Sequence, residues 1–207
     1  MIRLYTHPFS IVPRRVCIAL HEKGLAFESV ETDLYTKAPT PEFLALNPFA
    51  QIPVLDDGGF VVAESMAILE YLEEHYPAPA LLPSDIQLRA TARKLMCWGT
   101  DYWPPAWKQW MAPRLPEHLA NPWTDATVAE GRRDLCAHLD VLEQQLTGND
   151  WLVGLFSLAD VCYAPLVLVL DRVDLGEEIE RREQVKAWVE RLMARPSVFD
   201  TLMPTLR

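Results

Sequence analysis

The chain has 207 residues, half of them hydrophobic, so it can bury a full core and form one large domain or two small ones. Its formal net charge of -10 opposes nucleic-acid binding, because proteins that bind nucleic acids neutralise phosphates with Lys and Arg. The four cysteines form neither a C-x-x-C pair nor a Cys/His cluster of zinc-site spacing. We therefore expect a reducing compartment and no bound metal.

The sequence also argues against export and membrane insertion. No basic segment followed by an apolar core opens the chain. The longest strongly apolar run, residues 161–170, falls short of the roughly 18 residues that span a bilayer. These features predict a cytoplasmic protein without a membrane segment.

The first 47 residues predict a β-α-β unit followed by a second helix. Residues 2–5 and 27–32 are the expected strands, and the apolar positions of residues 16–20 mark a helix between them. That helix is expected to end near Gly24, since glycine suits the position after a helix C-terminus. The second helix is expected within residues 35–47.

A hairpin and a third helix follow. Residues 52–55 and 60–62 are short apolar runs, separated by two aspartates and two glycines that accept the positive φ values of a hairpin turn. Pro53 stands at the head of the first strand, where an Ile-Pro peptide bond can be cis. Ser65 is expected to cap a helix whose apolar positions recur at helical spacing after it.

The end of this hairpin offers sites for both charged groups of an amino acid. A helix N-terminus at Ser65 presents unpaired N–H groups and the positive end of the helix dipole, which favour a carboxylate. The neighbouring Glu64 can accept hydrogen bonds from an ammonium group. A hairpin that simply runs into a capped helix is the alternative interpretation.

Three short segments carry a resemblance to a known family. They resemble the glutathione-binding half of the cytosolic glutathione transferases. The segments are Asn47-Pro48, the run from Gln51 to Leu55, and Glu64-Ser65. The resemblance implies that Ile52, before a cis Pro53, pairs through its backbone with the cysteinyl part of glutathione. It also implies that Glu64 and Ser65 hold the γ-glutamyl end. Gln51, with Lys37 as second choice, is the candidate for the glycyl carboxylate.

The loop after the first strand carries the candidate catalytic residue, Ser10. Thioredoxin-like redox proteins have C-x-x-C in this loop, whereas Ser10 and Pro13 stand at the matching positions here, so dithiol chemistry is not expected. Resemblance to the serine-type transferases implies that the Ser10 hydroxyl donates to the glutathione sulfur. Such a donor lowers the thiol pKa from about 8.5 and favours the nucleophilic thiolate.

Two alternatives and the subclass stay open for this loop. Ser10 can instead be the N-cap of the first helix, and His7 can be read as a general base or as a surface histidine. Ile11-Val12 departs from the Ser-Ser-Cys motif of the zeta class, which isomerises maleylacetoacetate-type substrates. The resemblance is to a bacterial, serine-type protein with some zeta- and theta-like features and an unassigned subclass.

A proline-rich stretch predicts the domain boundary. We expect a thioredoxin-like, glutathione-binding domain of mixed four-stranded sheet and helices at residues 1–77, a linker at 78–84 and an all-helical bundle at 85–207. Helices are expected at residues 85–103, at 124–145, after the capping box Ser157-Leu158-Ala159-Asp160 and around 185–192. The same S-x-A-D box is characteristic of the family's helical domain. Helix capping and the family resemblance therefore agree that Ser157 and Asp160 stabilise the fold and do not catalyse.

Aromatic residues crowd into one part of the helical domain. In the family the corresponding helix faces the glutathione site, so a wall for an apolar acceptor is one interpretation and the domain core is the other. The candidate acceptor pocket consists of Phe9, Trp98, Tyr102, Trp103 and Trp107.

The expected function is glutathione transfer to a small hydrophobic electrophile, as in detoxification. Glutathione is then a cosubstrate, no cofactor is permanently bound, and the family implies a homodimer. Two rivals keep the fold: a regulator resembling the stringent starvation proteins, which bind RNA polymerase, and a ligand-storage protein without turnover. Glutathione-dependent isomerisation or dehalogenation is a third possibility within the enzyme class.

Overall fold

The computed structural model describes residues 1–34, 37–111, 113 and 124–201. The chain divides into two compact units. One comprises Met1–Leu82 together with Leu192–Arg207, and the other comprises Pro83–Arg191. The first unit therefore includes a segment from the end of the chain, which the proline-rich linker alone does not indicate.

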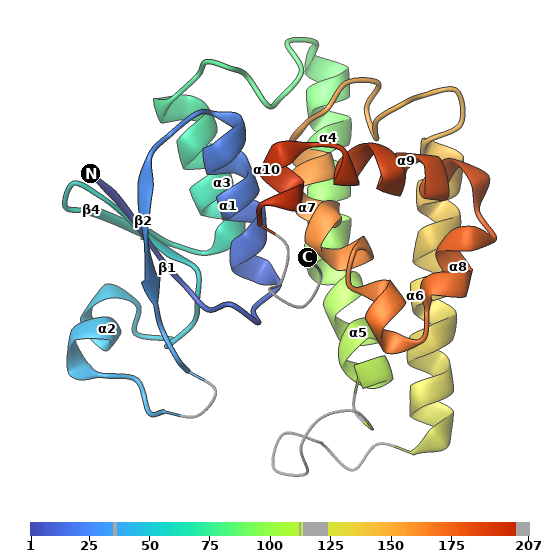
Figure 1. Ribbon diagram of the computed structural model, residues 1–207, viewed down its shortest axis with the longest axis horizontal. Helices are drawn as coiled ribbons and strands as arrows, with labels where there is room; N and C mark the ends of the chain where they lie inside the picture. Colours follow the sequence, from blue (N-terminus) through green and yellow to red (C-terminus); the bar gives the residue numbers. More distant parts are fainter. Residues whose placement is uncertain (35–36, 112, 114–123, 202–207) are drawn as a thin grey trace. The chain divides into compact units, whose positions relative to one another are not determined.

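The first unit has the expected β-α-β-α-β-β-α order. Its strands form one mixed sheet in the order β2-β1-β3-β4, in which β1 pairs parallel with β2 and antiparallel with β3. Helices α1 and α3 lie on one face of this sheet and α2 lies on the other (Figure 1). The bounds are β1 Ile2–Thr6, α1 Val12–Glu22, β2 Phe27–Glu31, α2 Pro41–Leu46, β3 Val54–Asp57, β4 Phe60–Ala63 and α3 Ser65–His75. The thioredoxin-like layout is thus confirmed.

The hairpin is tighter than the sequence suggests. β3 begins at Val54 and continues through both aspartates, because Asp56 pairs with Val61 and Asp57 with Phe60. The loop therefore contains only Gly58 and Gly59, whose φ values are 63° and 105°. Two consecutive positive φ angles are what a two-residue hairpin loop requires.

The C-terminus of α1 is fixed by backbone and side-chain contacts. Gly24 has a φ of 64°, its N–H donates to His21, and the N–H of Leu25 donates to Leu20, which is the Schellman arrangement. Beside it, the buried Lys23 ammonium pairs with Glu73 at 2.7 Å and donates to the carbonyls of Tyr76 and Pro79. These bonds fasten the proline-rich segment to the first unit.

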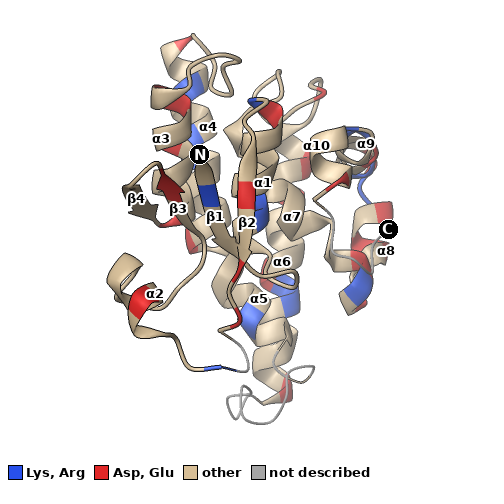
Figure 2. Ribbon diagram, turned by 60° about the vertical axis from the view of Figure 1, so that its left-hand side comes forward, with Lys and Arg blue, Asp and Glu red and all other residues tan. Residues whose placement is uncertain are grey.

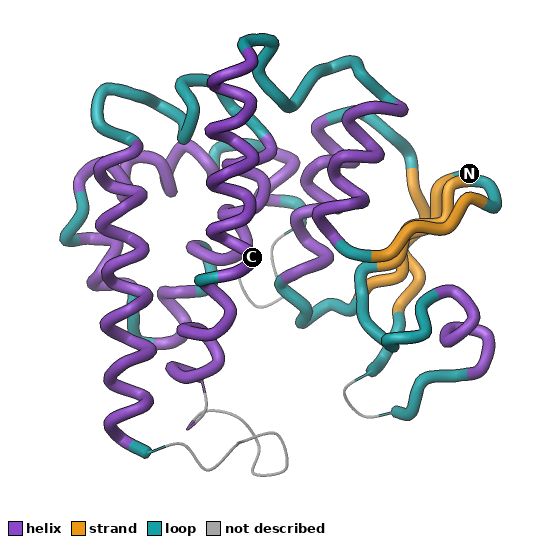
Figure 3. The backbone as a smooth tube through the Cα atoms, turned by 180° about the vertical axis from the view of Figure 1, so that it is seen from behind, coloured by secondary structure: helices purple, strands orange, loops and turns teal. Residues whose placement is uncertain are grey.

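The described part of the second unit contains helices and loops alone (Figure 3). Its helices are α4 Ile86–Asp101, α5 Trp103–Met111, α6 Asp125–Gln145, α7 Leu158–Val167, a 3₁₀ turn at Leu170–Val173, α8 Gly176–Glu180 and α9 Glu183–Met193, and α10 Pro196–Phe199 belongs to the first unit. The prolines expected to stop a helix lie in the first turn of α5, where a missing N–H is tolerated. Across the described residues, no helix combines the length and apolar character needed to cross a membrane.

The capping box at α7 is confirmed. The Asp160 carboxylate accepts hydrogen bonds from the backbone N–H groups of Ser157 and Leu152 and from the indole of Trp188, all within 3.0 Å. Every residue of α7 is buried. The box therefore fixes the start of the core helix of the second unit.

Helices α5 and α6 pack closely at a glycine. A Cβ added to Gly131 on α6 would lie 2.7 Å from the Ala106 carbonyl oxygen and 2.8 Å from the backbone nitrogen of Trp110, both on α5. Glycine is needed here for close approach and not for an unusual φ.

Candidate active site

The sheet register brings three of the predicted site segments to one end of the sheet. Tyr5 pairs with Val54, and Val54 pairs with Ala63, so these residues form one row across β1, β3 and β4. The loop with Ser10 leaves β1 beyond this row, Ile52-Pro53 enters β3 there, and Glu64-Ser65 leaves β4 there. Residues 10, 52 and 64, far apart in sequence, therefore lie around a common rim.

The entry to β3 is shaped for backbone recognition. The Ile52-Pro53 peptide bond is cis, as anticipated. Pro53 is buried and Ile52 is half-buried, and among the described residues the backbone of Ile52 makes no hydrogen bond. The amide and carbonyl of Ile52 are thus available to pair with an extended ligand.

Asn47 supports this entry, a role that the sequence did not reveal. Its side chain is buried, its Nδ2 donates to the Gln51 carbonyl at 2.9 Å, and its Oδ1 accepts from the Phe49 N–H at 3.1 Å. Ala50 between these partners has a φ of 51°, unusual for a residue other than glycine. The Asn-Pro sequence at the end of α2 was the available signal, because asparagine often stabilises turns through its side chain.

The start of α3 differs from the expectation in one respect. Ser65 is the first helical residue and not the N-cap, so that prediction was wrong. The N-cap is Glu64, with φ 71° and ψ 115° and no capping bond from its side chain. The carboxylate of Glu64 is consequently exposed at the rim, while Ser65 is buried beneath it. A strained non-glycine residue at a rim is typical of ligand sites.

The structure rules out the capping alternative for Ser10. Helix α1 begins at Val12, its N-cap is Ile11, and no side chain caps it. Ser10 is buried and its N–H donates to the His7 carbonyl at 3.0 Å. Within the described residues, its hydroxyl makes no hydrogen bond. The hydroxyl stays available as a donor, just before the positive end of the α1 dipole.

Arg14 braces the loop that carries Ser10. Its guanidinium donates to the carbonyl of Pro8 and to that of Thr201, both in the first unit. In the same loop, Nδ1 of His7 accepts from the Phe9 N–H at 3.3 Å. Hydrogen bonds therefore fix the Pro8 carbonyl and the Phe9 N–H, immediately before Ser10 in the chain.

The aromatic residues proposed for the acceptor pocket differ in exposure. Phe9 in the first unit and Tyr102 in the second are exposed, at 61% and 65%. Trp98 and Trp107 are half-buried, and the Lys94 ammonium lies 4.7 Å from the Trp98 ring centroid. Trp103 is only 1% exposed and packs edge-on against His138. The core interpretation, and not the pocket one, holds for Trp103.

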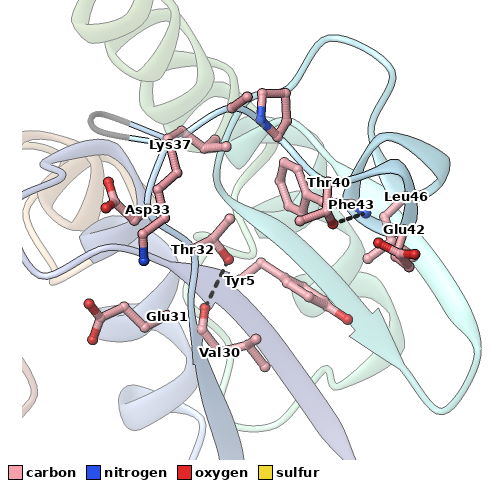
Figure 4. A pocket seen from close by; sticks show the side chains of 13 residues that line it. Tyr5, Val30, Glu31, Thr32, Asp33, Lys37, Thr40, Glu42, Phe43 and Leu46 are labelled. Carbon is pink, nitrogen blue, oxygen red and sulfur yellow. Dashed lines mark hydrogen bonds between the residues drawn. The ribbon is translucent and has the colours of Figure 1, made fainter.

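The two candidates for the glycyl carboxylate occupy different places. Gln51 is exposed immediately before Ile52, at the rim. Lys37 lines a cavity of about 550 Å³ between the end of β2 and α2 (Figure 4). Neither Ser10 nor Glu64 lines that cavity. The geometry therefore groups Gln51, and not Lys37, with the other predicted site residues.

Comparisons with known proteins agree with this fold. Residues 1–74 match the family described as "Glutathione S-transferase, N-terminal domain", and residues 108–196 match "Glutathione S-transferase, C-terminal domain". The chain is similar to glutathione S-transferase 3 of Zea mays, with 39% identity covering 97% of this chain and 93% of the relative. It is also similar to glutathione S-transferase F10 of Arabidopsis thaliana, with 33% identity covering 91% and 90%. The chain therefore belongs to the glutathione S-transferase family.

One solved structure similar to this chain is described with a glutathione derivative bound. The structure described as glutathione S-transferase-I bound with lactoylglutathione has a TM-score of 0.85 to this chain and 27% identity. The match covers 100% of this chain and 99% of that one. Both units of the present fold are thus included in the similarity.

Proposed function

We propose that the protein is a serine-type glutathione transferase that activates the thiol of glutathione for attack on a small apolar electrophile. The observation that carries this proposal is that the segments with Ser10, Ile52 and Glu64 leave or enter their strands at the same end of the sheet. Glutathione presents a thiol, a peptide backbone and an amino-acid end in a matching order. No metal or permanently bound cofactor is required.

Each residue has a specific part in binding. The backbone of Ile52 pairs with the cysteinyl unit, beside the cis bond to Pro53. The Glu64 carboxylate accepts from the γ-glutamyl ammonium, while Ser65 and the first turn of α3 receive the carboxylate. Gln51 donates to the glycyl carboxylate.

Ser10 is the residue that activates the glutathione thiol. Its hydroxyl donates to the sulfur and favours thiolate over thiol, so the proton leaves to solvent and the nucleophile forms at neutral pH. Glutathione bound next to an apolar electrophile holds its sulfur close to the reacting carbon. This positioning raises the rate above that of an encounter in solution. By family resemblance, Trp98, Tyr102 and Trp107 of the second unit and, separately, Phe9 of the first are candidates for contact with the acceptor, whereas the buried Trp103 is not.

Ser10→Ala tests the assignment. Glutathione binding is measured by calorimetry, and turnover is measured with a chlorodinitrobenzene-type electrophile across pH. If Ser10 lowers the thiol pKa from about 8.5 by one to two units, losing its hydroxyl would reduce the thiolate fraction near pH 7, and hence turnover, by about 8- to 25-fold. Binding should change little. Ser29→Ala, an exposed serine on β2, is the matched control.

Other outcomes separate the rivals. Absence of glutathione binding at millimolar concentration would reject the transferase and favour the regulatory protein. Binding without turnover of several electrophiles would favour ligand storage, and product analysis would detect an isomerase. A homodimer and a cytoplasmic location are part of the proposal by family resemblance, and sedimentation of the purified protein tests the first.

A further inference from the structure

The chain from His7 to Ser10 forms a β-turn that carries the proposed thiol-activating hydroxyl. The Ser10 N–H donates to the His7 carbonyl at 3.0 Å, which is the bond that closes a four-residue turn. Pro8 at the second position suits such a turn, because its ring fixes φ. Ser10 is buried, and it is the last residue of the turn. Any movement of the turn therefore moves Ser10.

The geometry of this turn depends on its central peptide unit, between Pro8 and Phe9. Types of turn differ mainly in how this unit is rotated. Both of its polar groups are bonded: the Pro8 carbonyl accepts from Nη2 of Arg14, and the Phe9 N–H donates to Nδ1 of His7 at 3.3 Å. The bond from Arg14 is the stronger of the two, because its donor is charged. Arg14 therefore contributes most to the orientation of the central peptide unit.

The guanidinium of Arg14 is also anchored outside the turn. Its Nη1 donates to the carbonyl of Thr201, which follows α10. The N–H and the hydroxyl of Thr201 both donate to the carbonyl of Val198 on α10, at 3.2 and 2.9 Å. Val198 is buried. One guanidinium thus links the turn before α1 to a buried part of α10.

Helix α10 lies beside α1 in both Figure 1 and Figure 2. Hydrogen bonds attach the two helices at two places. Arg195 and Ser197 bond to Glu22, the last residue of α1, whereas Arg14 lies in the first turn of α1. These attachments are roughly two helical turns, about 12 Å, apart along α1. The attachment at Arg14 is the one that also holds the turn with Ser10.

We propose that Arg14 is a positioning residue for glutathione transfer. It fixes the central peptide unit of the turn against α10, and so holds the Ser10 hydroxyl where it donates to the glutathione sulfur. A misplaced donor stabilises the thiolate less, so the thiol pKa depends on Arg14. Arg14 acts through Ser10 and does not itself contact the sulfur. This inference rests on the proposed function and adds to it a contribution from a segment near the end of the chain.

The pH dependence of the bound thiol tests this role. Arg14→Met keeps the length of the side chain and removes its donors. The variant should raise the pKa of the bound glutathione thiol, measured by the ultraviolet absorbance of the thiolate, by about 0.5 to 1. Turnover should fall by about 3- to 10-fold below that pKa and approach wild type above it, with little change in glutathione affinity. An unchanged thiol pKa would overturn the proposal.

Arg195→Met is the matched control, because it removes the arginine at the other attachment of α10 to α1. Both variants should lose stability. Arg195→Met should nevertheless leave the thiol pKa unchanged, since the Pro8 carbonyl keeps its bond to Arg14. An equal rise in both variants would mean that loosening of α10 in general raises the pKa, and would contradict the assignment.

A double variant shows whether Arg14 acts through Ser10. When Ser10→Ala has already removed the hydroxyl, adding Arg14→Met should raise the thiol pKa no further, because effects on one shared contact are not additive. A full further rise in the double variant would mean that the guanidinium charge acts on the thiolate directly. The positioning role would then be wrong.

Amide hydrogen exchange without glutathione separates this inference from the proposed function. Arg14→Met should speed exchange of the Ser10 N–H, which closes the turn, by about 10-fold, and Arg195→Met should not. If wild type binds glutathione but Arg14→Met leaves this exchange unchanged, the inference fails alone. If wild type binds no glutathione, the transferase proposal fails together with any role of Arg14 in transfer. Faster exchange in Arg14→Met would still identify Arg14 as the residue that fixes the turn.

Discussion

Arg195 grips Glu22 with two hydrogen bonds, from Nε at 2.9 Å and from Nη2 at 2.6 Å. The Ser197 hydroxyl donates to the same carboxylate. Burial alone would raise the pKa of Glu22, but the hydrogen bonds from Arg195 and Ser197 outweigh it and hold the pKa below 4.5. This contact attaches α10 to α1 within the first unit.

Glu22→Gln should lower the free energy of unfolding by about 1 kcal/mol near pH 7, since a partly exposed charged pair is screened by solvent. A carboxyl with a depressed folded pKa stabilises the protein above its unfolded pKa of about 4.5, and this contribution is lost as pH falls through the folded value. Denaturant unfolding of wild type and variant at pH 7 and pH 3.5 measures the loss of stability and its dependence on pH. The variant should therefore approach wild type at the lower pH. Glu28→Gln is the control, and an equal loss at both pH values would contradict the ionic origin.

Gly131→Ala should destabilise the second unit by about 2 kcal/mol. The new methyl group would overlap the α5 backbone at Ala106 and Trp110, and this overpacking exceeds the gain in helix propensity. Gly99→Ala on α4 is the matched control, because the nearest atoms to its Cβ would belong to the Tyr163 ring, at 3.2 Å and beyond, and not to a backbone. A shift in melting temperature no larger than that of the control would show that α5 moves aside easily.

His138 should make the stability of the second unit depend on pH. Burial lowers its pKa from 6.5 to about 4, and its Nε2 lies 2.6 Å from the Tyr163 hydroxyl. The unfolded chain therefore binds a proton between pH 6.5 and 4 that the folded protein does not, so stability falls as pH falls through this window.

His138→Gln removes this titration. The difference in unfolding free energy between wild type and variant should change by about 2 kcal/mol between pH 7 and pH 4.5, to the disadvantage of wild type at low pH. In this difference, the pH-dependent contributions of the groups that wild type and variant share cancel. A constant difference across that range would mean that His138 is as readily protonated when folded as when unfolded.

Glu64 should separate ligand binding from backbone strain. Glu64→Gln keeps the strained backbone and removes the charge, and should weaken glutathione binding by about 10-fold, the contribution of one charge-assisted hydrogen bond. Glu64→Gly should weaken binding similarly while the free energy of unfolding stays unchanged or rises by up to about 1 kcal/mol, because glycine adopts φ 71° without strain.

Ala50→Gly is the control for this pair, since Ala50 also has a positive φ but offers no charge. Ala50→Gly should relieve backbone strain without the loss of glutathione affinity that removing the Glu64 carboxylate produces. Calorimetry and denaturant unfolding are measured on all three variants. Unchanged glutathione affinity in Glu64→Gln would remove Glu64 from the site.

Features set by local chemistry were predictable from the sequence. Gly24, the two hairpin glycines and the Ser157 box each specify their own backbone geometry, and all were found where expected. The rim was predictable for a related reason, since strand order follows from the β-α-β-α-β-β-α pattern and fixes which chain segments meet.

Features set by tertiary packing were not predictable. Whether Trp103 lies in a core or at a surface depends on His138 and Tyr163, on two other helices. Glu64 alone links the end of β4 to the start of α3, and its positive φ is not encoded by its residue type. Arg14 acts through bonds to backbone carbonyls, and such bonds have no sequence signature.

The attachment of α10 to α1 has a consequence for how the protein is made. Glu22 leaves the ribosome long before Arg195, which follows it by 173 residues. The nascent thioredoxin-like unit thus carries the Glu22 carboxylate without its guanidinium until synthesis is nearly over. Domains generally fold as they emerge, so this first unit can pack its sheet early yet gains its last stabilising contact at the end of translation.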